Sequence, residues 1–310
     1  MSRSVSITVK KETTDEILRE LSKVPGITGI QVQRGISLNP PGDVIVVQTP
    51  NRYQSELMRF VAGKGIGKSP GSSIIINEPK ALISPDSQSV ITNDVSIVSW
   101  EEMDIVLAKE SNMTLNGVLL MAIAGIMATA GIVSNTLHFV IAAMLIAPGF
   151  EPIARIGLGL ACSSQGWKRG VIHSAIGYLA LLTGAALVSV ALRLVGSFPV
   201  LPSSGYEPVG SLVQFWTNST FSGIVVSVVA AIGGALLIES DRSVLTSGTM
   251  IGLSLIPSAA MISVGLVSLD FSLALQALVR FAIDFGIVLL AAFAVFLWKR
   301  KMTHKRKSML

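Results

Sequence analysis

The sequence predicts an α-helical, polytopic membrane protein with a small α+β domain at its N-terminus. Half of its 310 residues are apolar and only 14% are charged, whereas soluble domains carry about 25% charged residues. Residues 1–114 hold 12 basic and 13 acidic side chains, but the longer remainder holds 12 basic and only 6 acidic ones. The first part therefore reads as water-soluble, and the apolar runs of the second part are typical of membrane-spanning helices.

This composition excludes a wholly soluble enzyme, a disordered chain and a secreted domain held by disulfides. Cys162 is the only cysteine, so it cannot form an internal disulfide. The first residues are polar and basic, without the apolar run of a signal peptide. We therefore expect the N-terminal domain to stay in the cytoplasm.

Strand and helix patterns alternate through the first predicted domain, residues 1–80. The expected strands are Ser4–Val9, Ile27–Arg34, Asp43–Gln48 and Ser73–Asn77, and the expected helices are Thr13–Ser22 and Tyr53–Val61. Thr13 and Glu16 fit a capping box at the start of the first helix. The order βαββαβ predicts a ferredoxin-like fold, whose sheet face or helix ends would bind a small ligand or a second copy of the domain.

A glycine- and lysine-rich stretch, Gly63–Lys68, follows the second expected helix. Its amides could cradle an anion, but it lacks the strand-to-helix context of a phosphate-binding loop. The simpler interpretation is a helix C-terminus followed by a loop.

Residues 81–114 form the predicted linker, with weak strand character at Val90-Ile91 and at Val95–Val98, of which residues 96–97 lie outside the described residues. Ser99 and Glu102 fit a capping box that opens a short helix with Trp100 on its apolar face. We expect this amphipathic helix to lie at the membrane interface, with the indole at the level of the lipid headgroups. The alternative is that it packs on the soluble domain.

The transmembrane domain is expected to cover residues 115–298 and to be followed by a basic cytoplasmic tail, 299–310. Each of its six apolar segments is long enough to cross a hydrocarbon core of about 30 Å. The expected spans are Leu115–Val133, Thr136–Ala161, Val171–Leu194, Phe221–Ile238, Val244–Val267 and Leu273–Trp298.

The charges between these spans predict their orientation. Lys168, Arg169, Arg242 and the basic tail fall on one side, and the loops on the other side contain no lysine or arginine. The positive-inside rule then places both termini in the cytoplasm of a multi-pass cell-membrane protein. The tail is expected to contact anionic lipid rather than nucleic acid.

The six spans also read as two copies of three. Leu115–Ala161 resembles Phe221–Val267 at an offset of about 110 residues, and Pro148 in one copy corresponds to Pro257 in the other. Because each copy has an odd number of spans, the two copies face opposite ways. Inverted repeats with interrupted helices are typical of transporters with a binding site at the membrane midplane. The alternative is a duplicated scaffold without transport.

The prolines are expected to interrupt their helices and to release backbone carbonyls from helical bonding. Pro148 and Pro152 flank a glycine and predict the stronger break. In a membrane, released carbonyls must find partners or line a wet cavity. The alternative is a kinked helix whose free groups are bonded by neighbouring helices.

Four ionisable residues are expected deep in the membrane, where an unpaired charge costs about 3 kcal/mol or more. Glu151 and Arg155 are spaced i,i+4, as are Arg280 and Asp284, which places each acid and base on one helix face. The four could form one network. The predicted ion or substrate pathway consists of Pro148, Glu151, Pro152, Arg155, Pro257, Arg280 and Asp284. The alternative is that the two pairs only dock helices.

Neither catalytic chemistry nor a bound cofactor is expected. His138 and His173 lack metal-ligand spacing to another histidine, cysteine or carboxylate. No nucleophile, zinc or phosphate-loop motif occurs in a suitable context. We therefore expect a protein that is not an enzyme, has no metal site and has no cofactor.

Several motifs of the second part resemble a known family. They are Ala143–Pro148, Pro152-Ile153, Gly157–Leu160 and the Gly252–Gly265 segment. Together they resemble the uncharacterised hydrophobic-domain proteins of the domain-of-unknown-function family 389, over most of residues 115–296. The resemblance implies a bacterial or archaeal membrane protein and no established substrate.

The function that follows is a transporter or channel for an ion or small solute, gated by the cytoplasmic domain. Its expected partners are the lipid bilayer, the transported solute and a second copy of the chain. The alternative is a membrane sensor or scaffold that does not transport, and whose soluble domain binds a small ligand or partner.

Overall fold

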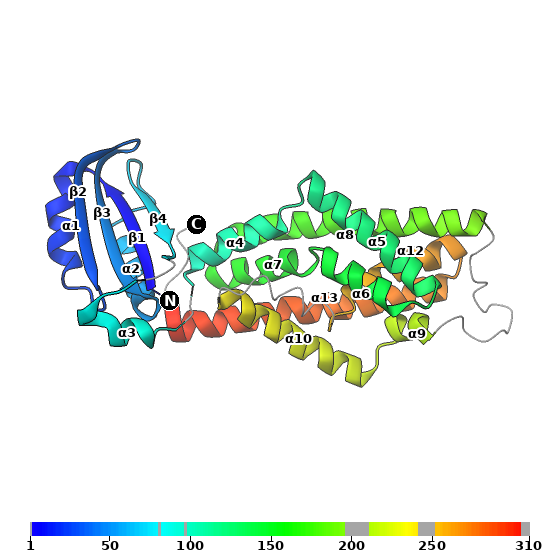
Figure 1. Ribbon diagram of the computed structural model, residues 1–310. Coiled ribbons are helices and arrows are strands. Elements are labelled where there is room, and N and C mark those ends of the chain that lie inside the picture. The colour runs from blue at the N-terminus through cyan, green and yellow to red at the C-terminus, as the bar shows by residue number, and fades with distance from the viewer. Residues whose placement is uncertain (1, 80–81, 96–97, 196–210, 241–251, 305–310) are drawn as a thin grey trace. The chain divides into compact units, whose positions relative to one another are not determined.

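In the computed structural model (Figure 1), the described residues are 2–79, 82–95, 98–195, 211–240 and 252–304. The chain forms two compact units. The N-terminal unit comprises residues 1–103 with 239–241 and 299–310, and the helical unit comprises residues 104–238 with 242–298.

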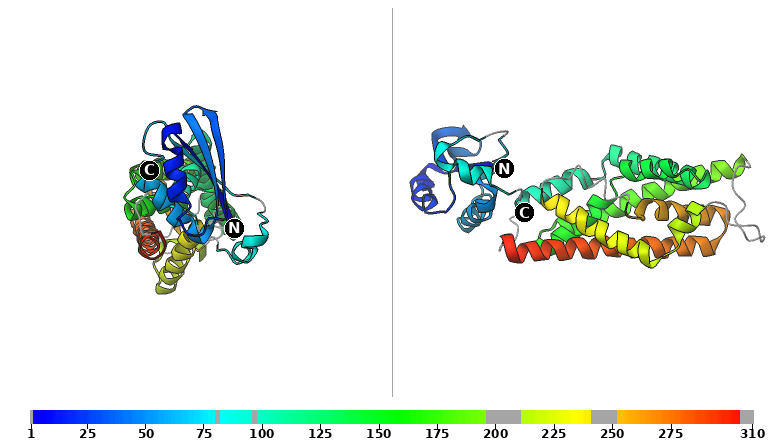
Figure 2. Two further views of the ribbon diagram at one scale, coloured as in Figure 1. Left: turned by 90° about the vertical axis from the view of Figure 1, so that its left-hand side faces the viewer. Right: turned by 60° about the horizontal axis from the view of Figure 1, so that its bottom comes forward.

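The N-terminal unit is built on a four-stranded antiparallel sheet with the strand order β2-β3-β1-β4. Its elements are β1 (Ser2–Val9), the 3₁₀ turn η1 (Lys11–Thr13), α1 (Thr14–Leu21), β2 (Gly29–Leu38), β3 (Pro41–Pro50), α2 (Asn51–Gly63) and β4 (Ser73–Asn77). The predicted βαββαβ order of elements is confirmed. Figure 2 shows α1 and α2 on the same face of the sheet.

The core of this unit lies between the sheet and the two helices. Alternate residues of β1, namely Val5, Ile7 and Val9, are buried beneath Ile17 of α1 and Leu57 of α2. Alternate residues of a strand point to the same face of the sheet, and here that face packs against the apolar faces of the two helices. Each large aliphatic side chain buried here contributes about 1.5–3 kcal/mol.

Two local predictions in this unit are wrong. Thr13 does not form a capping box, because its backbone already adopts a helical conformation and its hydroxyl donates to the Lys10 carbonyl at 2.9 Å. The helix therefore begins at Thr14. Val90 and Ile91 lie in α3 (Gln88–Thr92), which follows the 3₁₀ turn η2 (Pro85–Ser87), rather than in a strand.

The helix α4 (Trp100–Ser111) begins with the predicted capping box. Glu102 Oε2 accepts the Ser99 amide at 2.9 Å, and the Glu102 amide donates to Ser99 Oγ at 3.3 Å. Trp100 is completely buried, and Gln54 of α2 donates to Glu102 at 2.8 Å. The expectation of an indole at the lipid headgroups is thus wrong, and the alternative of packing on the soluble domain holds for this end of α4.

The helical unit contains four helices that are long and apolar enough to cross a membrane, or five if one bent pair counts as a span, among the described residues. Six spans were expected, but residues 244–251 of the fifth lie outside the described part. The elements of this unit are α5 (Leu115–Val133), α6 (Leu137–Ile146), α7 (Phe150–Cys162), α8 (Gly166–Leu194), α9 (Ser211–Thr217), α10 (Phe221–Glu239), α12 (Leu255–Ser268) and α13 (Phe271–Lys299). The π-helical turn η4 (Arg300–His304) follows α13 and belongs to the N-terminal unit.

The predicted break at Pro148 is confirmed. α6 and α7 are bent by 44° at this point. Ala147 is extended with ψ 120°, because a residue before proline is driven out of the helical region. Pro152 is the third residue of α7, a position at which a helix has no intrahelical acceptor for the missing N–H.

Pro257 does not interrupt a helix, contrary to the prediction. It is the third residue of α12, which begins after Ser254. A first-turn proline removes no intrahelical hydrogen bond. Pro152 and Pro257 therefore both lie three residues into a helix that starts inside the apolar unit.

Two glycines allow α5 and α8 to approach closely. A Cβ placed on Gly125 would lie 2.1 Å from the Leu181 carbonyl oxygen, and one on Gly184 would lie 2.1 Å from that of Ala122. Such contacts are typical of helix packing in membranes, where small residues bring backbones together.

We expect Gly184→Ala to destabilise the protein by about 1–3 kcal/mol, because α5 and α8 must separate to admit the methyl group. Gly233→Ala is the matched control, since a Cβ on Gly233 of α10 meets no atom within 4 Å among the described residues beyond its own stretch of helix. Thermal unfolding in detergent measures both variants. Equal melting temperatures for the two would contradict the close packing.

A buried carboxylate fixes the β2–β3 hairpin to α1. Asp43 Oδ1 accepts the Gly35 amide at 2.7 Å, and Oδ2 accepts the Thr14 hydroxyl at 2.8 Å. The Gly35 amide, followed by the Thr14 hydroxyl, holds the pKa of Asp43 below its ordinary value.

Asp43 therefore makes the N-terminal unit acid-sensitive. A lowered folded-state pKa contributes stability above the unfolded-state pKa of about 4, and this contribution is lost as the pH falls through the folded-state pKa. Protection of the β1 and β3 amides against hydrogen exchange should fall across this window in the wild type. Asp43→Asn should flatten that dependence, whereas the exposed Asp86→Asn should retain it.

Candidate functional site

The helical unit contains a buried ion pair on α13. Arg280 Nε donates to Asp284 Oδ2 at 3.1 Å, and the two side chains are 3% and 0% exposed. The i,i+4 spacing predicted this contact, and the structure confirms it. Pairing greatly reduces the cost of holding two charges away from water.

The guanidinium of Arg280 also joins two neighbouring helices. Its Nη2 donates to Ser227 Oγ of α10 at 3.3 Å and to Ser254 Oγ, just before α12, at 3.0 Å. Gly223 of α10 leaves room for it, since a Cβ there would lie 3.1 Å from Arg280 Nη1. One edge of the guanidinium is thus fixed by three helices.

Arg280 also lines a cavity of about 470 Å³. Its walls come from α6, α9, α10 and α13, and most of its lining is apolar. Arg280 Nη1 has no acceptor within the described part of the chain. Trp216 also lines the cavity, and its Nε1 is buried without a hydrogen-bond partner there.

Arg280 Nη1 and Trp216 Nε1, which lack a hydrogen-bond partner among the described residues, are both hydrogen-bond donors. A guanidinium favours carboxylate and phosphate oxygens, and charge-assisted bonds of this kind are about twice as strong as neutral ones. The arrangement is therefore suited to an anionic or acceptor-rich solute with an apolar part.

The break between α6 and α7 lies beside the same helix α13. Tyr178 of α8 donates its hydroxyl to the Gly149 carbonyl at 3.1 Å, and its ring stacks edge-on against Phe281 with centroids 4.8 Å apart. Glu151 is buried in the first turn of α7, where the helix dipole favours an acidic group. At Gly149, the alternative of a break bonded by a neighbouring helix is the one observed.

The predicted Glu151–Arg155 pair is not formed, so the four charges do not make one network. Arg155 Nη1 donates to Ser111 and Asn112 at 3.2 and 3.1 Å, and its Nε lies 3.7 Å from Asp104. The long side chain reaches the connection between α4 and α5. Arg155 thus lies near the end of the unit at which α5 begins.

The remaining polar residues of interest make local contacts. His173 Nδ1 accepts the Met113 amide at 3.1 Å. Within the described ranges, no group of three or more histidine, cysteine or carboxylate side chains could hold a metal ion. Ser227, Trp216 and Ser254 were not predicted as site residues, although the position of Ser254 before an apolar helix with an early proline is a known signal for a helix start.

Comparison with known proteins finds a family match for a large part of the helical unit. Residues 144–290 match the sequence profile described as "Domain of unknown function (DUF389)". These residues are a DUF389 domain. The predicted family resemblance is confirmed, and the Arg280–Asp284 pair, Ser227 and Ser254 all lie within the DUF389 domain.

One curated relative is "Uncharacterized protein MJ0678" of Methanocaldococcus jannaschii, which is 24% identical over 229 residues. The alignment covers 72% of this chain and 66% of the relative, so the chain spans about two thirds of that protein's length. No solved structure is significantly similar to the chain.

Breaking the buried pair should destabilise the DUF389 domain strongly. Arg280→Met leaves Asp284 charged and without its cation, and should cost about 3–5 kcal/mol. The double variant Arg280→Met with Asp284→Leu removes both charges and should recover much of this loss. Thermal unfolding of the single and double variants measures the coupling, and additive losses would contradict a shared ion pair.

Proposed function

We propose that this protein is a transporter or channel for an ion or small solute, and that Arg280 and Asp284 form the centre of its pathway. The observation that supports this most directly is a buried, fixed guanidinium at the wall of a cavity between apolar helices. Ionisable residues inside membrane helices are rare and commonly mark substrate or ion pathways. The protein is proposed not to be an enzyme.

We infer six spans arranged as an inverted 3+3 repeat in the cell membrane, with both termini cytoplasmic. Helix lengths support the repeat: α5 and α10 both have 19 residues, α8 and α13 both have 29, and α7 and α12 have 13 and 14. Both α7 and α12 end in a left-handed residue, Ser163 and Leu269. Helix starts inside a membrane unit are typical of transporter binding sites.

An anion is the solute that this site favours. Asp284, Ser227 and Ser254 hold one edge of the Arg280 guanidinium in place, and Nη1 is left for the solute. A donor fixed before binding loses little freedom when the solute arrives. The apolar walls would accept the rest of an organic acid.

The N-terminal domain is proposed to be ferredoxin-like and to regulate this pathway. Its strand order β2-β3-β1-β4, with one helix after β1 and one after β3, supports the assignment. The alternative function is a sensor or scaffold that does not transport and in which this domain binds the ligand. A cavity in the N-terminal domain supports that alternative, because it could hold such a ligand.

The test of transport is flux into proteoliposomes with chloride, acetate, phosphate and potassium as the solutes. We expect flux of at least one anion, and we expect Arg280→Lys and Asp284→Asn to reduce it about tenfold or more. Lysine cannot reproduce the planar fork that Asp284 and the two serines hold.

Asp270→Asn is the matched control, because Asp270 Oδ1 only caps α13 through the Leu273 amide at 3.0 Å and asparagine caps equally well. This variant should retain wild-type flux. Absence of flux for every solute, or equal flux in all variants, would contradict the proposal and favour the sensor.

A further inference from the structure

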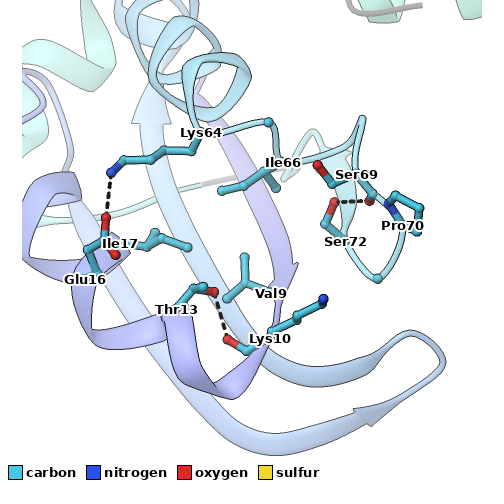
Figure 3. A pocket seen from close by; sticks show the side chains of 12 residues that line it. Val9, Lys10, Thr13, Glu16, Ile17, Lys64, Ile66, Ser69, Pro70 and Ser72 are labelled. Atoms are coloured by element: carbon cyan, nitrogen blue, oxygen red, sulfur yellow. Dashed lines mark hydrogen bonds and ion pairs between the residues drawn. The ribbon is translucent and has the colours of Figure 1, made fainter.

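A second cavity lies within the N-terminal unit. It has a volume of about 320 Å³, near the lower limit of small-molecule sites. Figure 3 shows it between the end of β1, the first turn of α1 and the loop that follows α2. Its floor is apolar, because Val9, Ile17 and Ile66 are buried residues of the core.

The loop on one side of the cavity has a fixed conformation. α2 ends at Gly63, and this confirms the prediction that the Gly63–Lys68 stretch is a helix C-terminus followed by a loop. Gly65, Gly67 and Gly71 then adopt φ values of 70°, 82° and 85°, which favour glycine. Ser72 Oγ accepts the Gly67 amide at 2.9 Å and donates to the Ser69 carbonyl at 2.8 Å. The loop is therefore tied across itself beside the cavity.

The two lysines at the cavity differ in their partners. Lys64 Nζ is neutralised by Glu16 at 2.9 Å and by Glu20 at 2.7 Å. These contacts raise the pKa of Lys64, with the Glu20 hydrogen bond as the larger cause. Lys10 has no hydrogen-bond or ion-pair partner for its side chain among the described residues, and it lies against Gly71.

The cavity consequently offers hydrogen-bond donors that have no protein partner among the described residues. Besides the Lys10 ammonium, the Ser69 hydroxyl makes no hydrogen bond within the described ranges. Both groups reach the cavity above its apolar floor (Figure 3). Glu16 adds a carboxylate to the lining, but its charge is already met by Lys64.

We propose that this cavity binds a small organic acid, with its carboxylate or phosphate group at Lys10 and Ser69 and its apolar part on Val9, Ile17 and Ile66. An unpaired ammonium favours an anion, and the apolar floor favours a solute that also buries carbon. The loop glycines hold the site open without a side chain of their own. Binding here stands apart from transport and is tested without measuring flux.

The test uses the full-length protein in lipid nanodiscs with ¹³C-labelled isoleucine methyl groups. The probes are isovalerate and isoamyl phosphate, with the neutral isovaleramide as the uncharged counterpart. We expect saturable shifts of the Ile17 and Ile66 methyl signals with at least one acid at millimolar concentrations, and none with the amide. Lys10→Gln should weaken binding about tenfold or more, since a charged hydrogen bond is lost.

Lys23→Gln is the matched control, because Lys23 is an exposed lysine of the same unit, just past the far end of α1. It should bind like the wild type, and the dispersed methyl spectrum of each variant verifies folding. The proposal is overturned if neither acid shifts these signals, if isovaleramide binds as well as the acids, or if folded Lys10→Gln binds with unchanged affinity.

Discussion

The helical unit depends on the requirement that buried polar groups have partners. Helices long and apolar enough to cross a membrane leave no water for an isolated charge or a free carbonyl. Arg280 Nε and Asp284 Oδ2 meet this requirement through each other, and Ser227 and Ser254 accept further hydrogen bonds from the arginine, whereas Asp284 Oδ1 has no hydrogen-bond partner among the described residues. Because these contacts come from α10, α13 and the start of α12, the ion pair also fixes how three helices meet.

The same requirement shapes the two helices that begin inside the unit. The third residue of each helix is a proline, which has no N–H group. An N–H at that position would have had no acceptor within the helix, so each helix begins with one fewer unpaired donor. At the α6–α7 break the Gly149 carbonyl is met by Tyr178, whose ring also packs on α13. The break and the ion pair are therefore linked through one helix.

The sequence predicted elements well where local pattern decides them. β4 and α5 have their predicted bounds, because strand alternation and an uninterrupted apolar run are local properties. The Arg280–Asp284 contact was also predictable, since helix geometry alone brings i and i+4 together. The Glu151–Arg155 contact was not formed despite equal spacing, because Asp104, Ser111 and Asn112 come from another part of the chain and compete for the arginine. Ser227 and Trp216 could not be found from spacing, since their place at the site follows from tertiary packing.

The two buried arginines show how a structural role differs from a functional one. Arg155 Nη1 donates to Ser111 and Asn112 at the α4–α5 connection, and its Nε lies 3.7 Å from Asp104 without a hydrogen bond. Such contacts dock one segment on another. Arg280 is held as firmly, yet it lines a cavity, and its Nη1 meets no acceptor among the described residues. A donor that is rigid, charged and open to a cavity is what binding an anion requires, and this asymmetry is the reason to assign solute binding to Arg280 rather than to Arg155.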